Sequence, residues 1–239
     1  MIETRGIATV VIGLVRPHLQ TTKPPRSLWV PFPLGRPLGE AEDPAFQRRV
    51  LMAALGLLER RDGPVLLVDF PDDAPSMTDT VGWTPQVHLA PIPSSLPADA
   101  AGWATAVTAE IELLRPHWSA AQRRFGRTTV GLSRLPLERW APYAATFLTG
   151  EIPASIVDGL SPALLLRTIA DDIKAFYSEA AQAAGPQPSS PQVNRWFWNR
   201  TLAGQLLRAL RLAALTSAHN GFNTVGSRFI VPGPWIEPS

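Results

Sequence analysis

The chain has 239 residues, of which 45% are hydrophobic and 18% charged, and its formal net charge at pH 7 is +2. This length allows one large domain or two small ones with a buried core. A charge so close to neutral excludes the polycationic surface that binds nucleic acid nonspecifically. The absence of cysteine excludes disulfides, thiolate metal sites and thiol chemistry within this polypeptide.

The apolar run at residues 7–15 has a length that a signal peptide core would also have. It follows Glu3, it is rich in β-branched residues and no small-residue cleavage pattern comes after it, so we predict a buried strand instead. No window approaches the ~18 uninterrupted apolar residues that a membrane span requires. We therefore expect a cytoplasmic protein with no membrane-spanning segment.

The first third of the chain alternates between strand and helix patterns. Residues 7–15, 27–32 and 64–70 are apolar runs typical of strands that are covered on both faces. A proline suited to a first helical turn follows the first run, and Asp43 and Pro44 are the expected N-cap and first residue of a longer helix after the second. The order of elements predicts a parallel βαβαβ unit with right-handed crossovers.

The rest of the chain changes in character. Residues 76–100 are rich in proline and have little periodicity, which predicts a long surface loop. Helices are expected over residues 103–124, 137–148, 161–184 and 194–218, with a short strand-like piece at residues 228–231. We therefore expect an α/β segment at residues 1–75, the loop, and a mainly α-helical region at residues 101–239 that packs on the first segment.

Residues 32–39 follow the second predicted strand and lead to the start of the next helix. Ligands of open α/β sheets bind at the carboxyl ends of strands, where Gly35 and Gly39 would let the backbone approach a ligand. The guanidinium of Arg36 would bind the carboxylate or phosphate group of a small anionic ligand. The alternative is that the glycines shape a turn and Arg36 is solvated. Arg26 follows two prolines and either binds the same anion or fixes the direction of the turn.

Two residues are weak candidates for acid–base catalysis. Asp69 ends the third apolar strand, where it would be buried at the same edge, and His18 follows the first strand. Each is equally explained by a structural role. No two histidines have the i, i+4 spacing of a metal site, and no glycine-rich nucleotide motif is present. We predict no metal and no cofactor.

Tryptophan is frequent in the second half of the chain. Trp196 and Trp198 lie close together near the start of the last predicted long helix. Tryptophan is enriched at protein interfaces, and it also fills the cores of helical domains. Both interpretations remain open, and the first makes these two residues candidates for an interface with another protein.

Four short motifs occur in a fixed order in the first third of the chain. They are Gly6-Ile7-Ala8-Thr9-Val10, Pro25-Arg26, Leu34-Gly35 through Gly39, and Asp43-Pro44 with Gln47-Arg48. In order and spacing they resemble the closing segment of the selenoprotein B family of glycine, sarcosine and betaine reductases, and of the related selenocysteine subunit of D-proline reductase. The resemblance covers less than a third of the chain.

In that family a selenolate or thiolate cleaves a carbon–nitrogen bond of the substrate reductively. The resemblance implies a related α/β scaffold and part of a small-molecule pocket, but this chain has no cysteine and lacks the half that carries the nucleophile. We therefore expect a non-thiol subunit of a heteromeric reductase-like complex whose partner contains cysteine or selenocysteine. The alternatives are a non-catalytic module for small-anion binding or assembly, and a cysteine-free enzyme that uses Asp69 or His18.

Overall fold

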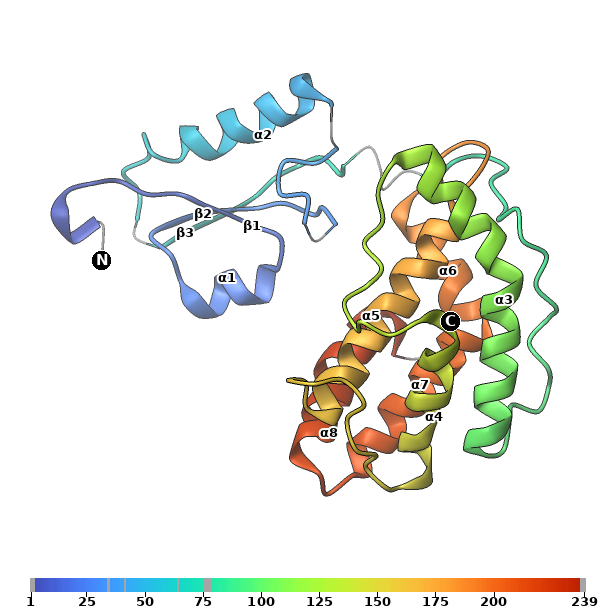
Figure 1. The fold of residues 1–239 in the computed structure, drawn as a ribbon. Coiled ribbons are helices and arrows are strands. Elements are labelled where there is room, and N and C mark those ends of the chain that lie inside the picture. The colour runs from blue at the N-terminus through green and yellow to red at the C-terminus, as the bar shows by residue number, and fades with distance from the viewer. Residues whose placement is uncertain (1–2, 34, 41, 64, 75–78, 237–239) are drawn as a thin grey trace. The chain divides into compact units, whose positions relative to one another are not determined.

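The computed structural model describes residues 3–33, 35–40, 42–63, 65–74 and 79–236. Leu34, Pro64 and residues 76–78, which belong to predicted segments, lie outside this part of the chain. The chain divides into two compact units, which we call the α/β unit (Met1–Asp79 with Ser189–Pro191) and the helical unit (Thr80–Pro188 with Gln192–Ser239). A parallel sheet followed by a mainly helical half confirms the predicted fold class (Figure 1).

The α/β unit has a parallel sheet of three strands in the order β1-β2-β3. The strands are β1 (Val11–Gly13), β2 (Arg26–Trp29) and β3 (Leu66–Asp69). Gly13 pairs with Trp29, which in turn pairs with Asp69. The strands are shorter than the apolar runs that predicted them, because only three or four residues of each segment pair in the sheet.

The two helices of this unit start where the sequence predicts them. Helix α1 (Arg16–Thr22) has a proline in its first turn. Helix α2 (Pro44–Gly56) begins after Asp43, whose carboxylate accepts a hydrogen bond from the Phe46 amide at 3.0 Å. This cap satisfies one of the amides that a helix start leaves without an internal partner.

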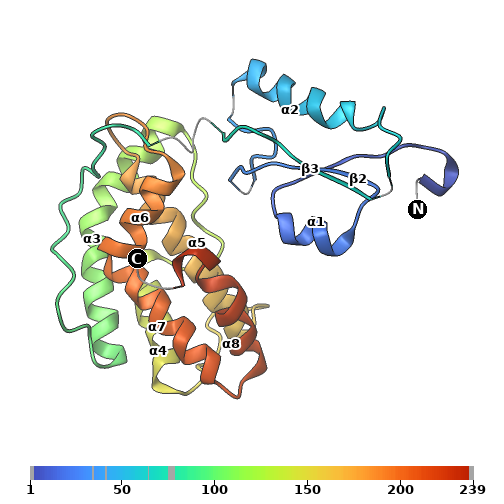
Figure 2. The same cartoon turned by 180° about the vertical axis from the view of Figure 1, so that it is seen from behind.

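The helices α1 and α2 lie on opposite sides of the sheet (Figures 1 and 2). Leu28 of β2 shares an apolar cluster with Phe46 of α2, whereas a side chain at Gly13, on the opposite face, would meet Leu19 of α1 at 2.6 Å. Because the strands follow one another in order, connections over opposite faces must have opposite hands. The expectation that both crossovers are right-handed is therefore wrong.

In the described residues, the helical unit contains α-helices that range from 6 to 26 residues in length. They are α3 (Ala100–Phe125), α4 (Trp140–Thr146), α5 (Pro162–Ala181), α6 (Ser190–Arg200), α7 (Leu202–Thr216) and α8 (Asn220–Val225). Asp99 and Ser161 cap α3 and α5 through hydrogen bonds from the amides of Gly102 and Leu164. The cap at Ser161 agrees with the predicted start of α5, whereas α3 begins three residues before the predicted start because Asp99 caps it.

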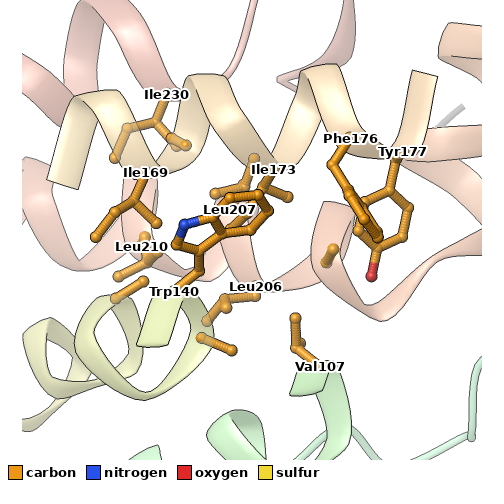
Figure 3. Close-up of a cluster of buried hydrophobic side chains, with 14 of the residues drawn as sticks. Val107, Trp140, Ile169, Ile173, Phe176, Tyr177, Leu206, Leu207, Leu210 and Ile230 are labelled. Atoms are coloured by element: carbon orange, nitrogen blue, oxygen red, sulfur yellow. The ribbon is translucent and has the colours of Figure 1, made fainter. Parts of the chain in front are cut away.

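The core of the helical unit surrounds Trp140 of α4, which is fully buried. Figure 3 shows its indole among apolar side chains of α3, α5 and α7. The ring of Phe176 meets it edge-on with centroids 5.8 Å apart, and its Nε1 donates to the Leu135 carbonyl at 3.1 Å. Burying each such large side chain contributes about 1.5–3 kcal/mol.

The single helix predicted over residues 194–218 is wrong, because the chain breaks between α6 and α7. Thr201 has an extended backbone, donates its hydroxyl to the Phe197 carbonyl at 2.7 Å and accepts the Gly204 amide at 3.0 Å. It thus ends one helix and caps the next. The apolar periodicity continues through the break, so the pattern alone did not reveal it.

The strand-like piece predicted at residues 228–231 is also wrong. Gly226–Ile230 forms a π-helical turn directly after α8. A side chain at Gly226 would lie only 2.1 Å from the Ala214 side chain of α7. The glycine therefore allows this turn to pack directly on α7, and that tertiary contact outweighs the β-branched composition of the segment.

Asp172 of α5 is completely buried, and it anchors the loop between α3 and α4. Its carboxylate accepts hydrogen bonds from the amides of Gly131, Leu132 and Ser133 at 2.8–2.9 Å, and from the Ser133 hydroxyl at 2.6 Å. A buried carboxylate is tolerated only when its oxygens are satisfied in this way. The loop therefore has its position fixed by one side chain.

Asp172→Asn should destabilise the protein strongly. The substitution replaces one acceptor oxygen with an NH2 group, which would face at least one backbone N–H and leave that N–H without an acceptor. We expect a loss of about 2–4 kcal/mol in the free energy of unfolding, measured by urea denaturation. The matched control is Asp171→Asn, which removes a half-exposed carboxylate paired with Lys174 and should cost less than about 1 kcal/mol. Equal losses in the two variants would contradict the role given to Asp172.

Candidate functional site

The carboxyl ends of the strands bring together Arg16, Trp29 and Asp69. The Arg16 Nε atom donates to both carboxylate oxygens of Asp69, at 3.1 and 3.2 Å. The guanidinium carbon lies 5.9 Å from the centroid of the Trp29 ring, between the two strand ends. The Asp69 side chain is 46% exposed and is held by a cation, so it is not the buried acid that the sequence suggested.

His18 lies in the first turns of α1 and is exposed. Its carbonyl accepts the Thr22 hydroxyl at 2.8 Å, but its imidazole makes no hydrogen bond to any residue that the structure describes. Nothing joins it to Asp69. The two catalytic candidates therefore do not form an acid–base pair through a direct contact.

The predicted glycine-rich segment forms two successive turns. The Arg36 amide donates to the Pro33 carbonyl at 3.1 Å, and the Gly39 amide donates to the Arg36 carbonyl at 3.0 Å. Gly35 and Gly39 have φ values of +88° and +89°, a conformation that favours glycine. The Arg36 guanidinium donates to the Glu40 carboxylate at 2.6 Å. Turn formation thus accounts for the glycines, and Arg36 already has an anionic partner.

Arg26 lies at the other end of β2, where the strand begins. The Glu3 carboxylate accepts hydrogen bonds at 2.9 Å from the Thr9 amide, the Thr9 hydroxyl and the Arg26 guanidinium. These hydrogen bonds from Thr9, together with the charge of Arg26, lower the pKa of Glu3. A cavity of about 100 Å³ is lined in part by Glu3, Arg26 and Arg60. Arg60 is itself paired with Asp62.

These positions separate the residues that the sequence grouped together. Arg26 begins β2, whereas Gly35, Arg36 and Gly39 follow the end of the same strand. They therefore do not form one anion site. What the sequence could not show is the ion-pair partner of each charged residue, since the partners come from other turns or elements.

The two tryptophans proposed for an interface lie in the core of the helical unit. Trp198 is 1% exposed and Trp196 is 7% exposed. The Trp198 ring packs edge-on against Phe197 with centroids 4.8 Å apart, and Trp196 lies 6.1 Å from the Tyr177 ring. Core packing accounts for both residues, and neither offers the exposed ring that an interface hot spot requires.

Glu110 is a buried titratable group with a shifted pKa that sequence reasoning missed. Its carboxylate, on α3, accepts the Leu202 amide at 2.9 Å, the Ala203 amide at 3.0 Å and the Tyr177 hydroxyl at 2.7 Å. Burial raises the pKa of Glu110, and these three hydrogen bonds oppose the effect. Burial and the neighbouring carboxylate also raise the pKa of Tyr177. An acid within the apolar stripe of α3, next to Ile111, was the available signal.

Glu110 therefore serves α7 as an additional N-terminal cap. Carboxylates favour helix N-termini because free amides and the helix dipole both attract negative charge. The group has a perturbed pKa, which often marks a functional site. Here all of its partners belong to the packed helices, so we assign it a structural role.

Among residues 3–236, with the gaps given above, no group of three histidines, aspartates or glutamates is placed to hold a metal ion. In the same part of the chain no helix is both long and apolar enough to cross a membrane. Comparison with protein-family models, with curated proteins and with solved structures finds no match to this chain.

The raised pKa of Glu110 predicts a pH dependence of stability. Glu110 binds its proton more tightly in the folded state than in the unfolded state. The contribution of Glu110 to the free energy of unfolding is therefore full below the ordinary glutamate pKa, and it falls as pH rises toward the pKa of Glu110 in the folded state. Glu110→Gln should remove this decline when unfolding free energies are measured from pH 4 to 7.

Glu112→Gln is the matched control on the same helix. Arg115 lowers the pKa of this exposed carboxylate, so its contribution is present above the ordinary pKa and is lost as pH falls. The Glu112→Gln variant should therefore keep the decline toward neutral pH. A decline that persists in Glu110→Gln would show that another group causes it.

Proposed function

We propose that this chain is the non-thiol subunit of a heteromeric reductase-like complex, in which a partner chain supplies the cysteine or selenocysteine. The observation that carries the proposal is the incomplete cover of the sheet in the α/β unit. Parallel sheets are normally covered on both faces. Here the sheet has three short strands, and Ile7, Val11 and Val15 are 58%, 41% and 47% exposed.

The exposed apolar residues lie along and beside an edge strand. Within the described residues β1 pairs with β2 alone, which leaves one side of β1 free for another strand. Ile7, Val11 and Val15 are spaced four residues apart, an even spacing that places residues of an extended segment on one face. A strand or helix from a partner would both extend the sheet and cover this face.

Two features favour a partner with a thiol or selenol. The chain has no cysteine, so chemistry of the kind found in the family that it resembles requires a second chain. Thr9 and Arg26, which belong to two of the motifs behind the resemblance, both donate to the Glu3 carboxylate. The motifs thus shape the start of the sheet and leave catalysis to the partner.

The alternative of an anion-binding module centred on Arg36 has less support. Arg36 and Arg26 are each paired with a carboxylate of this chain, and an incoming anion would have to displace it. Asp69 is likewise paired with Arg16, which disfavours it as a general base. Assembly with a partner is therefore the function that the α/β unit supports best.

The test is affinity capture with the full chain from its own cells. We expect a captured protein that contains cysteine or selenocysteine, and a complex that releases ammonia or an amine from glycine, sarcosine or betaine when a dithiol is supplied. A chain that stays monomeric and captures no thiol- or selenol-bearing protein would refute the proposal.

Val11→Lys tests the surface itself, because it places a charge on the exposed apolar face of β1. We expect capture of the partner to fall at least about tenfold, with the fold retained as judged by circular dichroism. Val81→Lys is the control, since Val81 is 98% exposed and belongs to the helical unit. Equal capture of the partner by the two variants would show that the interface does not include the exposed face of β1.

A further inference from the structure

We propose that a groove of the helical unit binds a small carboxylate with an aromatic or branched apolar body. The residues discussed for the α/β unit do not line this groove. The groove has a volume of about 440 Å³ and is formed by residues 84–85 and 87–91 together with Trp196 and Arg200. This volume lies within the range of small-molecule sites. We call it the Trp196 groove.

The wall contributed by the proline-rich segment is held in place by α6 and the chain before it. The Gln192 side chain accepts the Thr80 amide at 2.9 Å and donates to the Thr80 carbonyl at 2.8 Å. The Thr80 hydroxyl donates to the Gln187 carbonyl at 2.5 Å. Val87 is buried in the core, and Leu89 packs against it. The groove is thus formed before any ligand arrives, which lowers the entropic cost of binding.

The groove combines an apolar lining with positive charge. Pro85, Val87, Leu89, Pro91 and Trp196 supply the apolar part, and its polar side chains are those of Thr84, His88 and Arg200. Among the residues that the structure describes, no acidic side chain lines it. Apolar walls with a few polar groups at one side are typical of sites for amphipathic small molecules.

Arg200 is the residue that selects an anion. It is exposed, and it makes no hydrogen bond or ion pair with any residue in the described part of the chain. This distinguishes it from Arg26 and Arg36, which are paired. A guanidinium binds a carboxylate through two parallel hydrogen bonds, and His88 lies in the same groove as a second polar contact.

Arg200 is also the last residue of α6, where a cation would be favoured by the helix dipole alone. Two carbonyls of that last turn already have side-chain donors, however. The Phe197 carbonyl accepts the Thr201 hydroxyl, and the Trp198 carbonyl accepts Gln205 and Arg208 at 2.8 and 3.0 Å. Other donors therefore serve two of the carbonyls at the negative end of the helix, and Arg200 donates to neither in the described part of the chain, which leaves its charge for a ligand.

The experiment compares 4-phenylbutyrate with its neutral amide, 4-phenylbutanamide, by calorimetric titration of the full chain. We expect saturable binding of the carboxylate in the millimolar range or tighter, and about tenfold weaker binding of the amide. Arg200→Gln should reduce carboxylate affinity to that of the amide and leave amide affinity unchanged. Ala90→Trp, at an exposed lining position, should abolish binding of both.

Arg123→Gln is the matched control, because Arg123 is likewise an exposed arginine in the last turn of a helix and does not line the groove. It should leave both affinities unchanged. The proposal is overturned if neither compound binds saturably, if Arg200→Gln behaves like Arg123→Gln, or if Ala90→Trp still binds. None of these outcomes bears on capture of a partner through Val11, so this inference and the proposed function fail separately.

Discussion

Two buried carboxylates hold the helical unit together at the points where its chain is not helical. Glu110 links α3 to the start of α7 and to Tyr177 of α5, and Asp172 fixes the loop that leaves α3. Both acids are satisfied by amides and hydroxyls, with no arginine or lysine among their hydrogen-bond donors in the described residues. Apolar packing has little directionality, whereas the hydrogen bonds that these buried carboxylates accept require their donors to lie in fixed directions.

Glu179 of α5 extends the same arrangement toward the surface. Its carboxylate accepts the Trp118 indole at 2.8 Å, the Thr128 hydroxyl at 2.7 Å and the Thr129 amide at 2.7 Å. Asp172 and Glu179 lie two helical turns apart on α5, so one helix anchors both halves of the connection between α3 and α4. The position of α4, and hence of Trp140, follows from this.

The parts of the fold that the sequence predicted are those with local causes. The caps at Asp43 and Ser161 are followed directly by prolines, and both helices begin there in the structure. The break at Thr201 was missed because it depends on Glu110, which is distant in sequence. In the candidate site, Arg36 lies in the turns that follow β2, whereas Asp69 ends β3. Their pairing with Glu40 and Arg16 was not predictable, since rotamers and tertiary proximity decide it.

Gly204 shows how closely α6 and α7 meet at their joint. A side chain there would lie 2.5 Å from the Phe197 carbonyl oxygen, so only glycine fits beside the cap that Thr201 makes. A related chain with the same joint should therefore keep a Thr-x-x-Gly pattern between two helices. It should also keep an acidic residue on a third helix, whose carboxylate accepts hydrogen bonds from the first amides of the second helix. That combination gives a search pattern for distant relatives, and it would remain readable after the apolar core has changed through substitution.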